Sequence, residues 1–403
     1  MHAGSEFDLL IVGGYGHVGL PLGIVFANAG LNVALYDIDA AKGQTIAQGN
    51  MPFLEYDAEP ILQRVLGRTL HLVERLEAVA AADALIITVG TPVDEYLNPK
   101  LMPIIKLAGD LKPHLRPDHL VVLRSTVFPG TTRRLGEFLH HEGCVAHLAF
   151  CPERIVQGYA IRELRSLPQI VSGLTPAAAA RAHALFVRLQ VETLEVTVEE
   201  AELAKLFANA WRYIQFAAAN QFYMIATEAG ADFQRIHHAM THGYKRASDF
   251  PKAGFAAGPC LLKDTVQLSA FHRNNFMLGH AAMLVNEGLP SFLVRQLAAT
   301  HPLQGTTVGI LGMAFKKDVD DIRDSLSYKL GKLLRFHGAD VLYSDEFAQD
   351  PDFVGKEELL ERSAIAIVGA PHTAYRSLCI PDHIHLVDIW NVIPQRVAGA
   401  HAA

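Results

Sequence analysis

The stretch Leu9-Leu10-Ile11-Val12-Gly13-Gly14-Tyr15-Gly16-His17-Val18-Gly19 is a short apolar run followed directly by a glycine-rich turn. Its second, third and fourth glycines fit the pattern GxGxxG, in which the glycines close the turn, let the backbone approach a pyrophosphate and let the next helix pack on its strand. The next expected strand, Val33 to Tyr36, ends at Asp37, at about the 20-residue spacing of a ribose-binding carboxylate. This pattern predicts a dinucleotide site. Asp37 favours NAD, because its charge would repel the extra phosphate of NADP.

Short apolar runs continue through the first half of the chain. They are Ala84 to Val89, Leu120 to Arg124 and Ala146 to Phe150, and longer segments separate them. This rhythm predicts a doubly wound parallel sheet of the α/β class. Ligands of such sheets bind beyond the carboxyl ends of the strands. We therefore expect the functional residues of this half to gather where the strands end.

The length of 403 residues predicts several domains, because single cores rarely grow beyond about 250 to 300 residues. From about Val198 to Gly230 the apolar period becomes helical, with Leu203, Leu206, Phe207, Ala210, Ile214, Ala217 and Ala218 on one face. A second strand and turn, Thr306 to Gly312, opens another α/β segment, which lacks GxGxxG. We predict two Rossmann-like doubly wound parallel-sheet domains, residues 1–197 and 303–403. A helical domain with a long central helix, residues 198–302, joins them.

Composition excludes several classes of protein. A formal charge of −7 without a basic cluster argues against nucleic-acid binding. No apolar run approaches the roughly 20 residues that span a bilayer, and the first residues do not have the order of a secretion signal, so we expect a cytoplasmic protein. The four cysteines are widely spaced, which predicts reduced thiols. The histidines form no HxH or HExxH spacing, so we expect no metal site.

The segment Gly258-Pro259-Cys260-Leu261-Leu262-Lys263-Asp264 places a thiol, an amine and a carboxylate within five residues. A nicotinamide site combined with a cysteine suggests an aldehyde captured as a thioester. A thiol is only a few per cent ionised at neutral pH, so Cys260 needs a cation or a base nearby, and Lys263 and Lys205 are the candidates. Lys205 and Asn209 are four residues apart on the long helix and share one face.

The chain resembles the UDP-glucose/GDP-mannose dehydrogenase family, the nucleotide-sugar 6-dehydrogenases, over nearly its full length. Separated motifs match in order. They are Gly14 to Pro21, Gly90-Thr91-Pro92, Ser125 to Thr131, Cys151-Pro152-Glu153-Arg154, Glu202-Leu203-Ala204-Lys205 with Asn209, the cysteine segment, and Gly312 to Asp318 running on to Asp321-Ile322-Arg323-Asp324-Ser325. Several ordered matches make chance a poor explanation.

This resemblance implies a role for each matching residue. Catalytic roles fall on Cys260, Lys205, Asn209, Asp264, Thr126 and Glu153. Contacts with NAD are implied for Gly14, Tyr15, Gly16, His17, Val18, Gly19, Asp37, Thr91, Pro92, Ser125, Thr126 and Lys263. Contacts with the nucleotide sugar are implied for Glu153, Arg154, Lys205, Asn209, Tyr244, Lys245, Arg246, Gly258, Phe315, Lys317 and Arg323.

The family oxidises the C6 alcohol of a nucleotide sugar to a carboxylate and uses two NAD per turnover. The resemblance therefore implies that Cys260 forms a thiohemiacetal and then a thioester, that Lys205 and Asn209 stabilise negative charge on oxygen, and that Asp264 activates water. We also expect a homodimer formed through the central helical domain.

The identity of the sugar stays open, because two motifs resemble different branches of the family. Cys151-Pro152-Glu153-Arg154 is more like members that act on N-acetylated sugars, whereas Lys263-Asp264 is more like the UDP-glucose and GDP-mannose branch. UDP-glucose is the default expectation, with UDP-N-acetylhexosamine, GDP-mannose and TDP-glucose as alternatives. Ala257-Gly258, Pro259 and Gln157 depart from the common family pattern.

Two functions of other classes remain as alternatives. A two-electron hydroxyacid dehydrogenase would share the glycine turn and the Lys-Asn pair but would need neither Cys260 nor a second α/β domain. A catalytically silent nucleotide-binding protein would have little reason to keep a thiol, a lysine and a carboxylate together.

Overall fold

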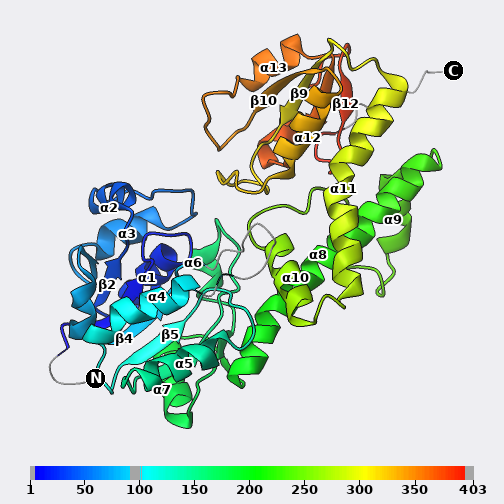
Figure 1. Cartoon of the computed structure of the whole chain (residues 1–403). Coiled ribbons are helices and arrows are strands. Elements are labelled where there is room, and N and C mark those ends of the chain that lie inside the picture. Colours follow the sequence, from blue (N-terminus) through cyan, green and yellow to red (C-terminus); the bar gives the residue numbers. More distant parts are fainter. Residues whose placement is uncertain (1–4, 91–99, 101, 395–403) are drawn as a thin grey trace. The chain divides into compact units, whose positions relative to one another are not determined.

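The computed structural model describes residues 5–90, 100 and 102–394. They belong to two compact units, Met1–Ala208 and Asn209–Ala403, and the boundary falls inside the long helix α8, Val198–Glu228. Figure 1 shows the elements of both units. The other 23 residues, 1–4, 91–99, 101 and 395–403, lie outside this description. The expected cofactor contacts of Thr91 and Pro92 therefore fall outside the described residues.

The first unit is built on six parallel strands in the order β3-β2-β1-β4-β5-β6. They are β1 Phe7–Val12, β2 Val33–Tyr36, β3 Leu70–Val73, β4 Ala82–Ile87, β5 Leu120–Leu123 and β6 His147–Phe150. The order reverses between β1 and β4, so the crevice at which such sheets bind ligands opens beyond these two strands. The sequence predicted five of the strands and missed β3, whose His71 interrupts its apolar run.

The helices of the first unit cover both faces of this sheet (Figure 1). They are α1 Gly19–Asn28, α2 Ala40–Ala47, α3 Glu59–Val65, α4 Met102–Leu111, α5 Thr131–His141, α6 Ala160–Glu163 and α7 Pro176–Val187, with short 3-10 turns at Leu76–Ala81 and Lys112–His114. A further parallel pair, β7 Gln169–Val171 and β8 Thr193–Glu195, lies outside the main sheet.

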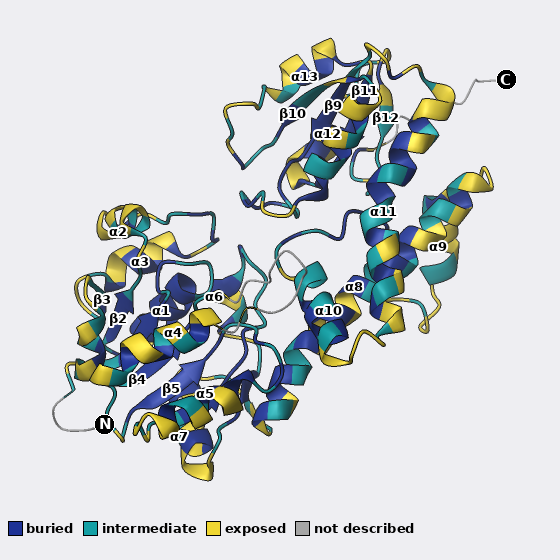
Figure 2. Cartoon of the chain, in the orientation of Figure 1, coloured by how far each residue is buried: buried dark blue, intermediate teal, exposed yellow. Residues whose placement is uncertain are grey.

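Alternate residues of each strand feed two separate cores. In β1, Leu9 and Ile11 pack with α1 on one face, while Leu10 and Val12 pack on the other face with α4 and α5. Strands β1, β4, β5 and β6 are accordingly almost wholly buried, as Figure 2 shows for the middle of the sheet. A sheet buried on both faces explains why the strands read as continuous apolar runs without alternation.

The start of α8 is anchored in the first unit by a buried carboxylate. Glu202 is 1% exposed, and its oxygens accept hydrogen bonds from Gly130 N at 2.6 Å, Thr132 N at 2.9 Å and Thr132 Oγ1 at 2.7 Å. Gly130 and Thr132 lie at the N-terminus of α5, where backbone N–H groups lack helical partners. This contact joins two of the sequence motifs, Ser125 to Thr131 and Glu202 to Lys205.

The second unit begins with helices. Beyond Asn209 it contains the rest of α8, then α9 Phe233–Thr241, α10 Leu261–Phe271 and α11 Met277–Thr300. Ala210 and Ala217 of the apolar face expected on α8 are buried, together with Tyr213, whereas Phe207 of that expected face is 54% exposed. Within the described residues, no helix combines the length and the apolar character that crossing a membrane requires.

The second unit also holds four parallel strands in the order β10-β9-β11-β12. They are β9 Thr307–Leu311, β10 Asp340–Ser344, β11 Ile365–Val368 and β12 His385–Val387, flanked by α12 Leu326–Phe336, α13 Lys356–Arg362 and a 3-10 turn at Thr373–Ser377. Helices α11 and α12 share a core with β9 and β11. The predicted α/β class with two Rossmann-like parallel sheets and a long central helix is confirmed.

Buried amides hold the helical part of the second unit together. Asn220 of α8 donates to Gly254 O at 3.0 Å and to Asn286 Oδ1 at 2.9 Å, and it accepts a bond from Gly254 N at 2.8 Å. Asn286 of α11 donates in turn to Tyr213 O at 2.9 Å. Both amides are fully buried. The network therefore ties α8, α11 and the segment that leads to Cys260.

We predict that Asn220→Ala lowers the free energy of unfolding by about 3 kcal/mol, because it leaves buried backbone and amide groups without partners. Urea denaturation followed by circular dichroism measures the change. Gln221→Ala is the matched control, since Gln221 is the exposed neighbour on the same helix and should change stability by less than about 0.5 kcal/mol. Equal effects of the two substitutions would contradict the network.

Candidate active site

The glycine turn between β1 and α1 lies at the carboxyl edge of the first sheet. Gly13 has a φ of 84°, and a Cβ on Gly19 would come within 2.3 Å of Gly13 O. Gly16 is different, because the nearest atom to a Cβ there would be 3.6 Å away. Thr88, after β4, donates its hydroxyl to Gly13 O at 2.9 Å, a contact that no sequence motif signalled. The turn therefore has the close backbone packing at Gly19 and the open side at Gly16 that a bound pyrophosphate requires.

Asp37 lies beside this turn. Its Oδ2 accepts a hydrogen bond from Tyr15 N at 3.0 Å and its Oδ1 accepts one from Asp39 N at 3.1 Å. These bonds fix the carboxylate at the end of β2, next to the glycine turn. The geometry fits the residue that binds the ribose of a dinucleotide.

The loops after β5 and β6 meet at a buried ion pair. Arg124, which is fully buried, donates Nε and Nη2 to Glu153 Oε2 at 3.0 and 2.6 Å. Glu153 Oε1 accepts bonds from Arg154 N at 2.7 Å and Ile155 N at 3.0 Å. Both oxygens of Glu153 thus order its loop, and its catalytic and substrate contacts remain predictions. Sequence reasoning missed Arg124, although a basic residue at the end of an apolar strand was a usable signal.

Other predicted residues of the first unit lie near the same edge. Ser125 and Thr126 follow β5 and are half-buried. Gln157 donates to His17 Nδ1 at 3.0 Å, and the His17 ring lies 4.0 Å from that of Phe53. A residue noted as a departure from the family pattern is therefore in direct contact with the glycine turn. Arg154 donates a hydrogen bond to Pro168 O.

The cysteines have contrasting environments. Cys151 is completely buried, and this burial raises the pKa of its thiol to about 12, so it stays protonated at neutral pH. Cys260 is exposed and occupies the N-cap position of α10. The partial positive charge at a helix N-terminus favours the thiolate form of a cysteine placed there. Of these two thiols, Cys260 has the setting of a nucleophile.

Asp264 lies one turn into α10 and is fully buried. Its Oδ2 accepts a hydrogen bond from Asn209 Nδ2 at 2.5 Å, and its Oδ1 lies 3.6 Å from Lys263 Nζ. Among the described residues, Oδ1 has no hydrogen-bond donor. The structure therefore brings together three predicted residues, Asn209, Lys263 and Asp264, and the last two follow Cys260 within four positions in the chain.

The cysteine segment packs against the segment that follows β9. A Cβ on Gly258, whose φ is 98°, would lie 2.5 Å from the Phe315 ring, and Gly258 N donates to Asp324 O at 3.2 Å. Arg323 forms a bidentate pair with Asp321, and this hydrogen-bonded carboxylate raises the pKa of Arg323, with the charge of Cys260 acting in the same direction. Arg323 thus interacts electrostatically with Cys260. The expectation that Lys263 or Lys205 assists this thiol stays a prediction.

The remaining predicted residues are more dispersed. Lys317 lies 3.7 Å from Asp318 in the segment after β9. Tyr244, Lys245 and Arg246 are exposed after α9. Lys205 is half-buried on the part of α8 that belongs to the first unit. The substrate contacts expected of these residues stay predictions.

A cavity of about 390 Å³ lies at the opposite edge of the first sheet. Its lining comes from the amino ends of β1, β4 and β5 and from α7, and includes Asp8, Asp83, Asp118, Arg181 and Arg188. Parallel sheets bind their ligands at the carboxyl edge, where the glycine turn and Asp37 lie. We therefore expect the dinucleotide at that edge and not in this cavity.

Comparison with known families covers most of the chain. Residues 9–190 match the NAD binding domain of the UDP-glucose/GDP-mannose dehydrogenase family, residues 199–288 match its central domain, and residues 309–395 match its UDP binding domain. The chain belongs to this family. The glycine turn and Asp37 accordingly lie in its NAD-binding domain, and the segment after β9 lies in its UDP-binding domain.

Individual relatives agree with this membership. The UDP-N-acetyl-D-mannosamine dehydrogenase of Pyrococcus horikoshii is 28% identical over 91% of this chain and 90% of its own length. The corresponding enzyme of Yersinia pestis is 27% identical over 82% and 83%. The solved structure of a UDP-glucose dehydrogenase from Pyrobaculum islandicum is 27% identical, covers 96% of this chain and 95% of that one, and superposes with a TM-score of 0.88. The protein is an NAD-dependent nucleotide-sugar dehydrogenase, an oxidoreductase that acts on a CH–OH group.

We predict that two glycine substitutions separate packing from binding. Gly19→Ala should destabilise the first unit by about 2 kcal/mol, because its Cβ would clash with the backbone of Gly13. Gly16→Ala has room in the fold but should weaken NAD binding about tenfold or more, because it blocks the close approach of the pyrophosphate. Thermal melting and calorimetric titration with NAD measure the two effects. Unchanged melting of Gly19→Ala would contradict the packing role.

Proposed function

We propose that this enzyme oxidises the C6 alcohol of a UDP-linked hexose to the uronic acid in two NAD-dependent steps, through a thioester on Cys260. The exposed thiol at the N-terminus of α10, with the buried pair Asn209–Asp264 behind it, carries the proposal. NAD, when bound, accepts a hydride from C6 in each step. Residues 1–197 would bind it, residues 198–302 would carry the cysteine, and residues 303–403 would bind the nucleotide.

The covalent sequence assigns a task to each residue. The first oxidation converts the alcohol to an aldehyde, with the hydroxyl proton passing to Lys205 or to water. The Cys260 thiolate adds to the aldehyde carbon and forms a thiohemiacetal. Loss of a second hydride and a proton gives the thioester, during which Lys205 and Asn209 stabilise charge on the oxygen. Donors of this kind each lower the activation free energy by roughly 3 to 4 kcal/mol.

Hydrolysis then releases the acid. A water molecule adds to the thioester carbonyl, its proton passes to a base, and the C–S bond breaks to regenerate Cys260. We assign the base to Asp264, because its Oδ1 accepts no hydrogen bond from the described residues. Thr126 and Glu153 complete the proposed site. The Arg323 guanidinium favours the thiolate at the start of the next cycle.

The nucleotide sugar would be held by the segment after β9. Phe315, Lys317 and Arg323 lie on this segment, in the part of the chain that matches a UDP binding domain. A diphosphate requires cations, which Lys317 and Arg323 supply. Tyr244, Lys245, Arg246 and Gly258 are proposed as further contacts with the substrate.

The relatives favour an N-acetylated sugar over glucose, which is the default expectation from the sequence. Several curated relatives are UDP-N-acetyl-D-mannosamine dehydrogenases at 26% to 28% identity. We therefore propose a UDP-N-acetylhexosamine as the first candidate. UDP-glucose is the second candidate, supported by the adjacent Lys263–Asp264 pair and by the similarity to a UDP-glucose dehydrogenase structure.

We also propose that the enzyme is a homodimer that assembles through its helical part. Apolar side chains lie exposed along one side of α8, since Trp211, Phe222 and Ile225 are 60%, 45% and 54% exposed and are separated by intervals that keep them on one face. Leu284 of α11 is 71% exposed. A water-exposed apolar stripe of this kind is typical of a subunit interface.

We predict that the enzyme forms two NADH per sugar oxidised and that Cys260→Ser lowers the rate of acid formation at least roughly a thousandfold, because serine is not ionised at neutral pH. NADH absorbance over a panel of UDP-N-acetylmannosamine, UDP-N-acetylglucosamine, UDP-glucose and GDP-mannose, with the acid quantified by mass spectrometry, measures both. Cys379→Ser is the matched control, since Cys379 is also exposed. One NADH per sugar would reject the thioester route, and no NADH with any sugar would favour a silent binding protein.

The dimer has its own test. Trp211→Glu places a charge in the middle of the exposed stripe and should shift the protein to a monomer, measured by analytical ultracentrifugation. Phe336→Glu on α12 is the control, because Phe336 is 86% exposed and lies outside the stripe. A dimer that persists in Trp211→Glu at micromolar concentration would contradict an interface at this face.

A further inference from the structure

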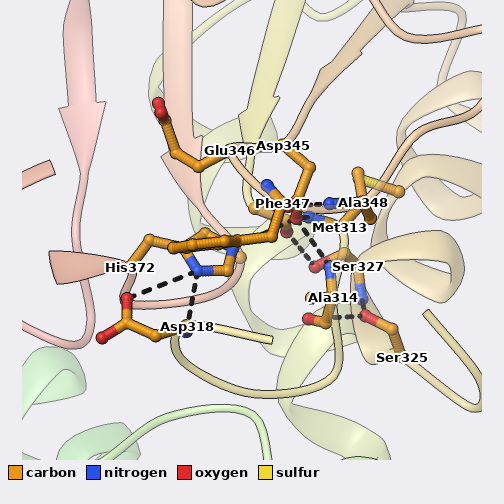
Figure 3. A network of polar contacts seen from close by, with 12 residues as sticks. Met313, Ala314, Asp318, Ser325, Ser327, Asp345, Glu346, Phe347, Ala348 and His372 are labelled. Atoms are coloured by element: carbon orange, nitrogen blue, oxygen red, sulfur yellow. Dashed lines mark hydrogen bonds and ion pairs between the residues drawn. The ribbon is translucent and has the colours of Figure 1, made fainter. Parts of the chain in front are cut away.

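His372 occupies the carboxyl edge of the second sheet, after β11, and is fully buried (Figure 3). Its Nδ1 accepts a hydrogen bond from Asp318 N at 2.9 Å, so this nitrogen must carry a lone pair. The proton of the neutral ring is then on Nε2, which donates to Asp345 Oδ2 at 3.1 Å. One side chain thus joins the ends of β10 and β11 to the segment that follows β9.

Asp345 is held independently of the histidine. Its Oδ2 accepts bonds from Met313 N at 2.6 Å and Ala314 N at 2.8 Å, and its Oδ1 accepts bonds from Phe347 N at 2.8 Å and Ala348 N at 2.9 Å. Burial acts to raise the pKa of Asp345, but the hydrogen bond from His372 and those from the amides of Phe347 and Ala348 outweigh it and lower the pKa. The carboxylate therefore stays charged and orients the imidazole ring.

Asp318 needs support from outside its own segment. Its φ is 54°, a left-handed conformation that costs free energy in a residue other than glycine. Its carboxylate accepts bonds from Thr373 N at 2.7 Å and Thr373 Oγ1 at 2.5 Å, and its N–H is bound by His372. The adjacent residues His372 and Thr373 thus bind both the backbone N–H and the carboxylate of Asp318.

The segment Met313–Asp324 connects the hydrogen bonds around Asp318 to the proposed substrate site. It bears Lys317 and Arg323, and Phe315 N donates to Asp321 O at 2.9 Å across its base. The Phe315 ring and Asp324 O contact Gly258, two residues before Cys260. A shift of Asp318 would therefore move the adjacent Lys317 and disturb the packing of the cysteine segment.

We propose that His372 is a positioning residue, whose neutral ring holds segment Met313–Asp324 in the conformation that binds the nucleotide. The inference rests on the proposed function only for the identity of that ligand. His372 belongs to none of the motifs to which we assigned a catalytic or binding role. It is also not one of the proposed contacts with the nucleotide sugar. Its effect is exerted through the N–H of Asp318.

Three substitutions of His372 distinguish the role of Nδ1 from that of Nε2. His372→Phe keeps an aromatic ring without either polar atom and should weaken UDP binding about tenfold, because a buried N–H loses its acceptor. In His372→Asn, Oδ1 takes the place of Nδ1, so UDP affinity should stay within about threefold of wild type. His372→Gln supplies a donor near the position of Nε2 but no acceptor for Asp318 N, and should bind UDP as weakly as the Phe variant. Calorimetric titration with UDP measures all three.

Hydrogen exchange supplies a second readout. Peptides that span Met313–Asp324 should exchange faster in the Phe and Gln variants than in the Asn variant, and KM for the nucleotide sugar should rise more than kcat falls. His385→Phe is the control, because His385 is a histidine of the same sheet that is exposed, and its ring contacts that of His301. It should leave UDP affinity unchanged.

The outcomes distinguish this inference from the proposed function. If Lys317→Ala weakens UDP binding while His372→Phe binds normally, the positioning role is overturned and the nucleotide site stands. If both bind UDP normally, both assignments are overturned. Should His372→Phe fail to fold, the Asn and Gln variants still decide, because equal UDP affinity in these two would overturn the inference.

Discussion

The hydrogen bond from Asn209 Nδ2 to Asp264 Oδ2, at 2.5 Å, ties α10 to α8 inside the second unit. A fully buried carboxylate is costly unless it is paired, and the amide and the Lys263 ammonium offset that cost. Because Asp264 lies one turn from Cys260, the same contact fixes the helix N-terminus that carries the thiol. The orientation of the proposed nucleophile therefore depends on a polar pair behind it and not on the cysteine loop alone.

Buried carboxylates perform a similar task elsewhere in the molecule. Glu202 joins α8 to the start of α5, Glu153 is locked to Arg124, and Asp345 gathers four backbone amides at the end of β10. Each lies close to a carboxyl edge of a sheet or to a helix N-terminus, where backbone N–H groups lack partners. The strands supply a rigid base, and these acids fix the irregular segments on which function depends.

The second unit shows why distant motifs belong together. The cysteine segment and the segment after β9 are more than 50 residues apart in sequence, yet Gly258 packs against Phe315 and bonds to Asp324. A side chain at position 258 would clash with the Phe315 ring, so the glycine is required by packing and not only by flexibility. The proposed nucleotide site and the thiol are thereby linked through one stretch of backbone.

The sequence by itself determined the α/β class, the glycine turn with Asp37, the long helix and the grouping of thiol, amine and carboxylate, because apolar periodicity and glycine spacing are local properties. It could not reveal that Arg124 pairs with Glu153, that the charges of Arg323 and Cys260 interact, or that His372 accepts a hydrogen bond from Asp318. These contacts join residues that are 29, 63 and 54 positions apart. Only tertiary packing brings such residues together, because burial forces each charge and each backbone N–H to find a partner wherever the fold supplies one.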